Sequence, residues 1–190
     1  FSLFDIKGGD KHNAIPREAY AKLSINKKNK SLCITEIKNE EKNILDEIKP
    51  IDPNLKVDIQ ASESPKMVLE KQSQESLLNL LHGLPHGVHQ MNYEIKTLVN
   101  TSTNLATISV KDHSILIGMS SRSPMKSALQ DMRERIKSIA TLAGAKVSEG
   151  TPYPGWKPDL QSKLLGLSKK IFLDMFKTEP KIEAIHAGLE

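Results

Sequence analysis

The fold of this 190-residue chain is most restricted by a short loop sequence near its N-terminus, which reads Gly8-Gly9-Asp10-Lys11-His12-Asn13-Ala14-Ile15-Pro16. Residues 1–6 are mainly apolar, and apolar and polar residues alternate over 18–25, so we expect a strand on each side. The glycines permit a sharp turn and Pro16 fixes its own φ, which holds Asn13 at the end of a sheet. A plain hairpin connection and a loop that carries a binding group are both open at this point.

Helical and extended patterns alternate along the rest of the chain. The periodicity predicts helices over residues 35–48, 64–81, 123–143 and 160–175, and strands over 55–61, 93–110, 115–119, 145–148 and 182–185. The glycine-rich segment 82–89 predicts a loop. Together these elements predict an α/β (α+β) fold with an open, mostly antiparallel sheet covered by helices. Ferredoxin-like ββαβ units are expected at about 1–61 and 93–148.

A change of composition at residues 150–159 predicts a domain boundary. This segment contains three prolines and two glycines, which exclude a helix or a central strand. We therefore expect one unit over residues 1–152 and the start of another over 153–190. The chain begins at Phe1 without a methionine and ends soon after an expected strand, so we expect both ends to continue in a longer protein.

Composition argues against several classes of protein. The net charge of +4 comes from charges of mixed sign, and aromatic residues make up 4% of the chain, so neither a phosphate-binding track nor a base-stacking surface is indicated. No apolar run is long enough to span a membrane. The single cysteine, Cys33, is expected to be a structural thiol in a reducing compartment.

Histidines provide the most evident metal-binding candidates. His82, His86 and His89 have a spacing that would let imidazoles converge on zinc, but no carboxylate or cysteine lies close by in sequence. A mobile surface turn is the preferred interpretation. His12 and His186 stand in more constrained loops, where a structural role is favoured over a catalytic one.

Arg122 is a candidate anion-binding residue. It follows an expected strand and directly precedes Ser123 and Pro124, which are expected to begin the best helix of the chain. Its planar guanidinium could bind a carboxylate beside the sheet. The alternative is a surface arginine, although the positive end of the helix dipole disfavours a cation there.

Three sequence blocks resemble one known family. They are the opening loop through Pro16-Arg17-Glu18-Ala19, the pair Leu142-Ala143-Gly144-Ala145-Lys146 and Tyr153-Pro154-Gly155-Trp156-Lys157-Pro158-Asp159, and the end Ile185-His186-Ala187-Gly188-Leu189-Glu190. In order and approximate spacing they are similar to segments of the aminoacyl-histidine dipeptidases, two-metal peptidases that cleave Xaa-His dipeptides such as carnosine.

The resemblance implies that this chain contains parts of two domains of a longer, cytoplasmic enzyme. Residues 1–152 would form most of its lid domain, without the first strand and helix, and 153–190 would re-enter the catalytic domain. The lid would mediate a homodimer, and neither nucleic acid nor membrane would be a partner. Two zinc ions, or similar divalent metals, would be bound by residues outside this chain, so the chain alone is expected to bind no metal and to hydrolyse nothing.

The resemblance also implies three contacts to the dipeptide substrate. Asn13 would hydrogen-bond the substrate or its tetrahedral intermediate, Arg122 would bind the C-terminal carboxylate, and Gly188 would let the backbone approach closely. No catalytic residue and no metal ligand is expected in this chain. The sequence after Arg122, Ser123-Pro124-Met125-Lys126, departs from the usual family pattern.

A second interpretation belongs to another class of function. The chain could be a stand-alone dimerisation or binding module of the open-sheet type with no catalysis, because an exposed edge strand favours pairing with another chain. Nucleic-acid binding is the third possibility.

Overall fold

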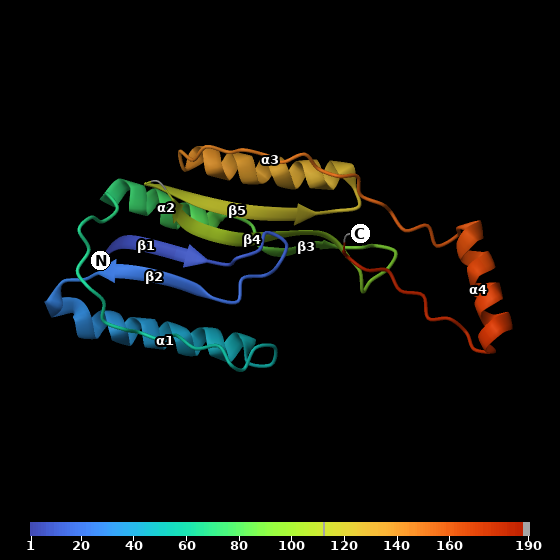
Figure 1. The fold of residues 1–190 in the computed structure, drawn as a ribbon, viewed down its shortest axis with the longest axis horizontal. Coiled ribbons are helices and arrows are strands. Elements are labelled where there is room, and N and C mark those ends of the chain that lie inside the picture. The colour runs from blue at the N-terminus through green and yellow to red at the C-terminus, as the bar shows by residue number, and fades with distance from the viewer. Residues whose placement is uncertain (112, 188–190) are drawn as a thin grey trace.

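The computed structural model describes residues 1–111 and 113–187. Its elements are β1 (Ser2–Gly8), β2 (Ala19–Ser24), the short 3-10 helix η1 (Lys27–Asn29), α1 (Lys30–Ile48), α2 (Lys71–Gly83), β3 (Gly87–Met91), β4 (Val99–Lys111), β5 (Ser114–Arg122), α3 (Lys126–Leu142) and α4 (Lys163–Phe176). The strands form an open antiparallel sheet with helices beside it (Figure 1). This confirms the predicted α+β class.

Strand β4 is the centre of the sheet. Along one edge it pairs with β5, from Ser102 opposite Arg122 onward. Along its other edge it pairs first with β3, where Gly87 lies opposite Thr103, and later with β1, where Gly8 lies opposite Ile108. We call the intervening part of this edge, residues 104–107, the seam.

Helices α2 and α3 cover one face of the sheet (Figure 1). Two groups of buried side chains form the core between these helices and the strands: Leu3, Leu77 and Ile108 in one group, and Leu80, Leu84 and Ala140 in the other. Burial of such side chains contributes roughly 1.5–3 kcal/mol each for the larger ones, so this face carries most of the hydrophobic stabilisation. In contrast, α1 and α4 contain no buried residue.

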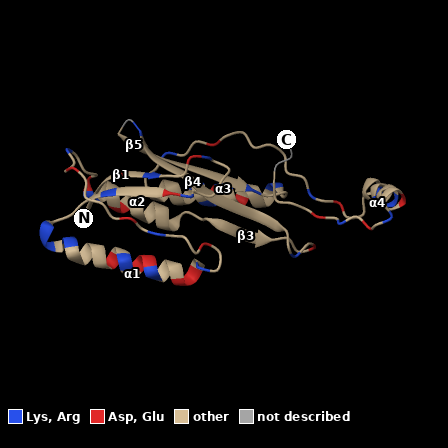
Figure 2. Cartoon of the chain, turned by 60° about the horizontal axis from the view of Figure 1, so that its bottom comes forward, with Lys and Arg blue, Asp and Glu red and all other residues tan. Residues whose placement is uncertain are grey.

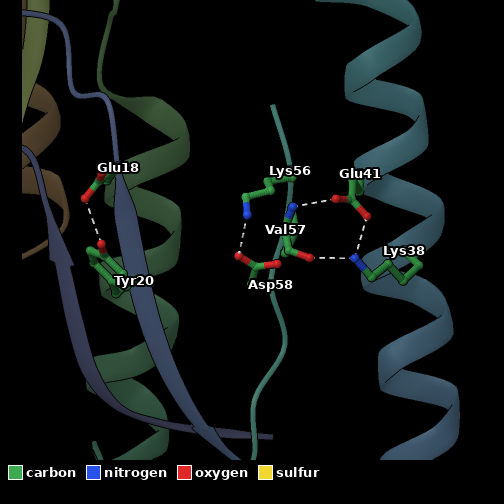
Figure 3. A network of polar contacts seen from close by, with 7 residues as sticks. All are labelled: Glu18, Tyr20, Lys38, Glu41, Lys56, Val57 and Asp58. Atoms are coloured by element: carbon green, nitrogen blue, oxygen red, sulfur yellow. Dashed lines mark hydrogen bonds and ion pairs between the residues drawn. The ribbon is translucent and has the colours of Figure 1, made fainter. Parts of the chain in front are cut away.

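The predicted strand over residues 55–61 is wrong. The segment is extended but joins no sheet, and it runs beside α1 (Figure 3). The backbone N–H of Val57 donates to the Glu41 carboxylate, and the Lys38 ammonium donates to the Val57 carbonyl. Side chains of α1 therefore satisfy the backbone groups that a neighbouring strand would otherwise pair.

The predicted strands over 145–148 and 182–185 are also absent, so neither ββαβ unit is complete. After α3, Gly144 adopts a φ of +75° and the N–H of Ala145 donates to the carbonyl of Ala140. This C-terminal cap turns the chain back along the helix. Arg133 then pairs with Glu149, which holds the segment against α3 and away from a sheet edge.

The other boundaries differ by a few residues. Helices α1 and α2 begin at Lys30 and Lys71, and β3 begins at Gly87, within the segment 82–89 that was expected to be a loop. Helix α3 begins after Met125, whose N–H donates to the Ser123 hydroxyl in a preceding turn. Ser123 therefore stabilises the approach to the helix and does not cap it directly.

The surface charges are of both signs. Basic and acidic side chains are interspersed along α1 (Figure 2). Across residues 1–111 and 113–187, no helix combines the length and apolar character needed to cross a membrane.

Candidate functional site

The loop between β1 and β2 closes over the seam of β4. The N–H of Gly9 donates to the carbonyl of Glu18 (3.2 Å), which closes the base of the loop. Gly9 has a φ of +63°, and a Cβ at this position would lie 1.9 Å from the carbonyl oxygen of Ala106. The Asn104 amide donates to the carbonyl of Ala14 (2.7 Å). The residue beside Ala14, which is Asn13, is therefore held over β4.

The pleat of β4 and β5 directs one set of polar side chains toward this loop. Ser102 lies opposite Arg122, and Asn104 lies opposite Ser120. Since alternate residues of a strand point to the same face, these four side chains share one face of the two strands. All four line one cavity.

The opposite face of the same strand pair is fixed by hydroxyl pairs. The Thr101 hydroxyl lies 3.1 Å from that of Ser123, and the Thr103 hydroxyl lies 2.8 Å from that of Ser121. Both threonines are buried. Paired hydroxyls satisfy buried polar groups and fix the register that sets Arg122 in place.

The cavity has a volume of about 320 Å³ and brings together two of the residues expected to contact a ligand. Asn13 and Arg122, from the β1–β2 loop and the last position of β5, both line it. Ser102, Asn104, His86 and His186 supply the other main polar groups. Gly188, the third expected contact, lies outside the described residues. We refer to this space as the Arg122 cavity.

The structure adds two histidines whose place in the site could not be predicted from sequence. His86 precedes β3, and its Nδ1 accepts a hydrogen bond from the N–H of Leu105 at the seam (3.1 Å). Its ring proton is thereby assigned to Nε2. His186 lies after α4, and its Nε2 is 2.7 Å from the Ser102 hydroxyl. In the sequence, His86 was a candidate only as a zinc ligand, and His186 stood in the last family-like block, two residues before Gly188.

The electrostatics of the cavity favour an anion. Among the described residues that line it, the ionisable groups are Arg122, His86 and His186, with no carboxylate. Burial, and secondarily the charge of Arg122, lower the pKa of His186 below its usual 6.5. Asn104 also carries a buried Oδ1 atom that has no partner within the described structure.

A larger cavity of about 1600 Å³ lies against α2, α3 and β5, and includes residues 65–70 and 145–152 in its walls. His12 lines it, but Asn13 and Arg122 do not. The larger cavity therefore lacks the Asn13 amide and the Arg122 guanidinium. The Arg122 cavity, which contains both, is the candidate functional site.

The histidine triplet considered as a zinc site does not converge. His82 lies near the end of α2, His86 faces the Arg122 cavity, and the ring of His89 lies 3.5 Å from Arg135 of α3. In the described part of the chain, no three His, Cys, Asp or Glu side chains form a group that could hold a metal ion. Cys33 is half-buried on α1.

Known proteins that are similar to this chain include two dipeptidases. No protein-family model matches the chain. A cytosol non-specific dipeptidase from Escherichia coli (strain K12) is 30% identical to it over 188 residues. The crystal structure of an aminoacylhistidine dipeptidase from Vibrio alginolyticus matches it with a TM-score of 0.93 at 26% identity.

These two matches each cover 99% of this chain, but they cover 39% of the Escherichia coli protein and 38% of the Vibrio alginolyticus chain. The chain thus spans about two fifths of the length of these relatives. The agreement in sequence and in fold extends over nearly all of its residues. The resemblance predicted from the sequence motifs is therefore confirmed: over nearly all of its residues, the chain is similar to part of an aminoacylhistidine dipeptidase.

Proposed function

We propose that residues 1–152 form most of the lid domain of a metal-dependent dipeptidase that hydrolyses Xaa-His dipeptides in the cytoplasm. The observation that carries this proposal is the meeting of Asn13 and Arg122 in one cavity. Arg122 binds the C-terminal carboxylate of the dipeptide, for which a guanidinium has matching bidentate geometry. Asn13 donates its amide hydrogen to the oxygen on which negative charge develops during hydrolysis.

The metal ions of this enzyme are bound outside the chain. The described residues do not assemble a set of metal ligands, so they do not fit a metal centre. The contribution of this chain is to bind and orient the substrate. The complete enzyme would bind two zinc ions, or similar divalent metals, through residues outside this chain.

Residues 153–190 are proposed to be the start of a catalytic-domain segment. Helix α4 stands apart from the sheet in Figure 1 and has no buried residue. Its exposed apolar side chains are Leu164, Leu167, Ile171, Phe172, Leu173, Met175 and Phe176. An apolar stripe of this kind is stabilised by packing against another surface, which a catalytic domain would supply.

The test is mutation of Arg122 in the complete protein encoded around these residues. We expect Arg122→Ala to lower kcat/KM for carnosine by about 100-fold, because the substrate carboxylate loses a charge-assisted partner. Arg122→Lys should recover part of the loss, since it restores charge without the planar fork. The control is Arg135→Ala on the exposed side of α3, which should leave kcat/KM unchanged. An Arg122→Ala enzyme with unaltered kcat/KM would refute the assignment.

The alternative function is a stand-alone dimerisation or binding module. It is favoured by the outer strands β2 and β5, each of which pairs along one edge only within the described sheet. A homodimer formed through this domain is also part of our main proposal. Sedimentation therefore reports the dimer, whereas hydrolysis of carnosine by the complete gene product separates the enzyme from the module.

A further inference from the structure

His186 is attached to the sheet next to Arg122. The Ser102 hydroxyl lies 2.7 Å from Nε2 of His186, although the two residues are far apart in sequence. Ser102 is also the direct cross-strand partner of Arg122. One serine therefore fixes the relative positions of an imidazole and a guanidinium in the Arg122 cavity.

The ionisable groups around His186 would favour binding of an anion. Burial and the positive charge of Arg122 both lower the pKa of His186 below its usual 6.5, which favours the neutral ring at pH 7. The ionisable groups that face it across the described cavity wall are Arg122 and His86. A bound carboxylate would neutralise Arg122 and offer acceptor oxygens to the ring.

We propose that His186 is a second substrate-contacting residue of this site, which together with Arg122 binds the carboxylate of the dipeptide, and that Ser102 positions its ring. This inference rests on the proposed function, because it takes the carboxylate at Arg122 as given. In the proposed arrangement the Ser102 hydroxyl donates to Nε2. The ring proton then lies on Nδ1, which donates to a carboxylate oxygen that the guanidinium leaves free.

Carboxylate binding and ring protonation are linked in this arrangement. An anion between Arg122 and His186 offsets the repulsion that lowers the pKa of His186, so binding should raise that pKa. A role limited to holding the segment against the sheet would not require this response. The shift therefore separates ligand contact from a purely structural bond.

The first test uses the complete enzyme with carnosine and with its C-terminal carboxamide. We expect His186→Ala to raise KM for carnosine about tenfold with little change in kcat. The reason is that the lost hydrogen bond to the carboxylate would stabilise the bound substrate and the transition state equally. The carboxamide should show less than a twofold change. The matched control, His82→Ala on α2, should alter neither substrate.

Ser102 variants test the positioning role. Ser102→Ala should raise KM for carnosine by a smaller factor than His186→Ala, and Ser102→Thr should restore it because the hydroxyl is retained. A His186→Ala enzyme that treats carnosine and its carboxamide alike would overturn the inference. If Arg122→Ala likewise fails to distinguish the two substrates, the proposed function fails as well.

The second test measures the ring directly by NMR of the wild-type enzyme labelled with 15N-histidine. Unlabelled carnosine should raise the apparent pKa of His186, identified by its absence from His186→Ala spectra, and the carboxamide should not. A pKa that stays constant while carnosine saturates the enzyme would refute the contact.

Discussion

Gly9 is the residue on which the geometry of the Asn13 loop depends most directly. Its φ of +63° suits glycine, and the space where a Cβ would lie is occupied by the carbonyl oxygen of Ala106 at 1.9 Å. The loop can therefore approach the seam of β4 closely enough for Asn104 to bind the carbonyl of Ala14. A side chain at this position would move Asn13 away from Arg122.

We predict that Gly9→Ala destabilises the protein by about 3 kcal/mol or more, because strain at positive φ adds to a backbone clash. The control is Gly144→Ala, where φ is +75° but no atom lies within 4 Å of the added Cβ. That substitution should cost only about 1–2 kcal/mol, from backbone conformation alone. Urea unfolding of both variants measures the difference, and equal losses would show that the contact with Ala106 does not matter.

At the scale of elements, the attachment of residues 55–61 to α1 shows how side chains can replace a strand partner. Glu41 accepts from Val57 and from Lys38, and Lys38 donates to the Val57 carbonyl (Figure 3). The hydrogen bond from Lys38, and next that from Val57, lower the pKa of the Glu41 carboxyl below its usual 4.5. The ionised carboxylate is therefore the form that holds the segment.

This attachment should weaken in acid. Because the pKa of Glu41 is lower in the folded state, its contribution is complete above pH 4.5 and is lost as the pH falls through the lowered value. Glu41→Ala should reduce the protection of the Val57 amide from hydrogen exchange about fivefold at neutral pH, as expected for one hydrogen bond. Glu40→Ala, one position earlier on the same helix, is the control. Unchanged protection at Val57 would contradict this role for Glu41.

For the whole molecule, the groups that the fold brings together predict substrate binding without catalysis. The described residues bring together polar groups for an anionic ligand but no ligand set for a metal. We predict that the purified 190-residue chain does not hydrolyse carnosine when zinc is added, whereas the complete gene product does. Release of histidine, measured by chromatography, checks both. Metal-dependent turnover by the chain alone, absent from an Arg122→Ala control, would disprove the assignment of catalysis to other parts.

The sequence by itself determined the local features of the structure. The glycines and proline around Asn13, the apolar stripes of α2 and α3, and the place of Arg122 at a strand end depend on neighbours along the chain, so periodicity and turn chemistry sufficed to predict them. The three motif blocks likewise indicated the resemblance to the aminoacylhistidine dipeptidases. The predicted strand over 55–61 failed because an alternating pattern specifies a half-buried extended segment but not what covers it.

Only the tertiary structure decided which distant residues meet. Strand β3 pairs with the edge of β4 at Thr103, although its first residues lie in a segment that was expected to be a loop. The change of partner along β4 creates the seam over which Asn13 and His86 lie, and the return of the chain after α4 brings His186 to Ser102. These contacts join segments that no local pattern relates, because strand pairing and cavity formation depend on the whole sheet.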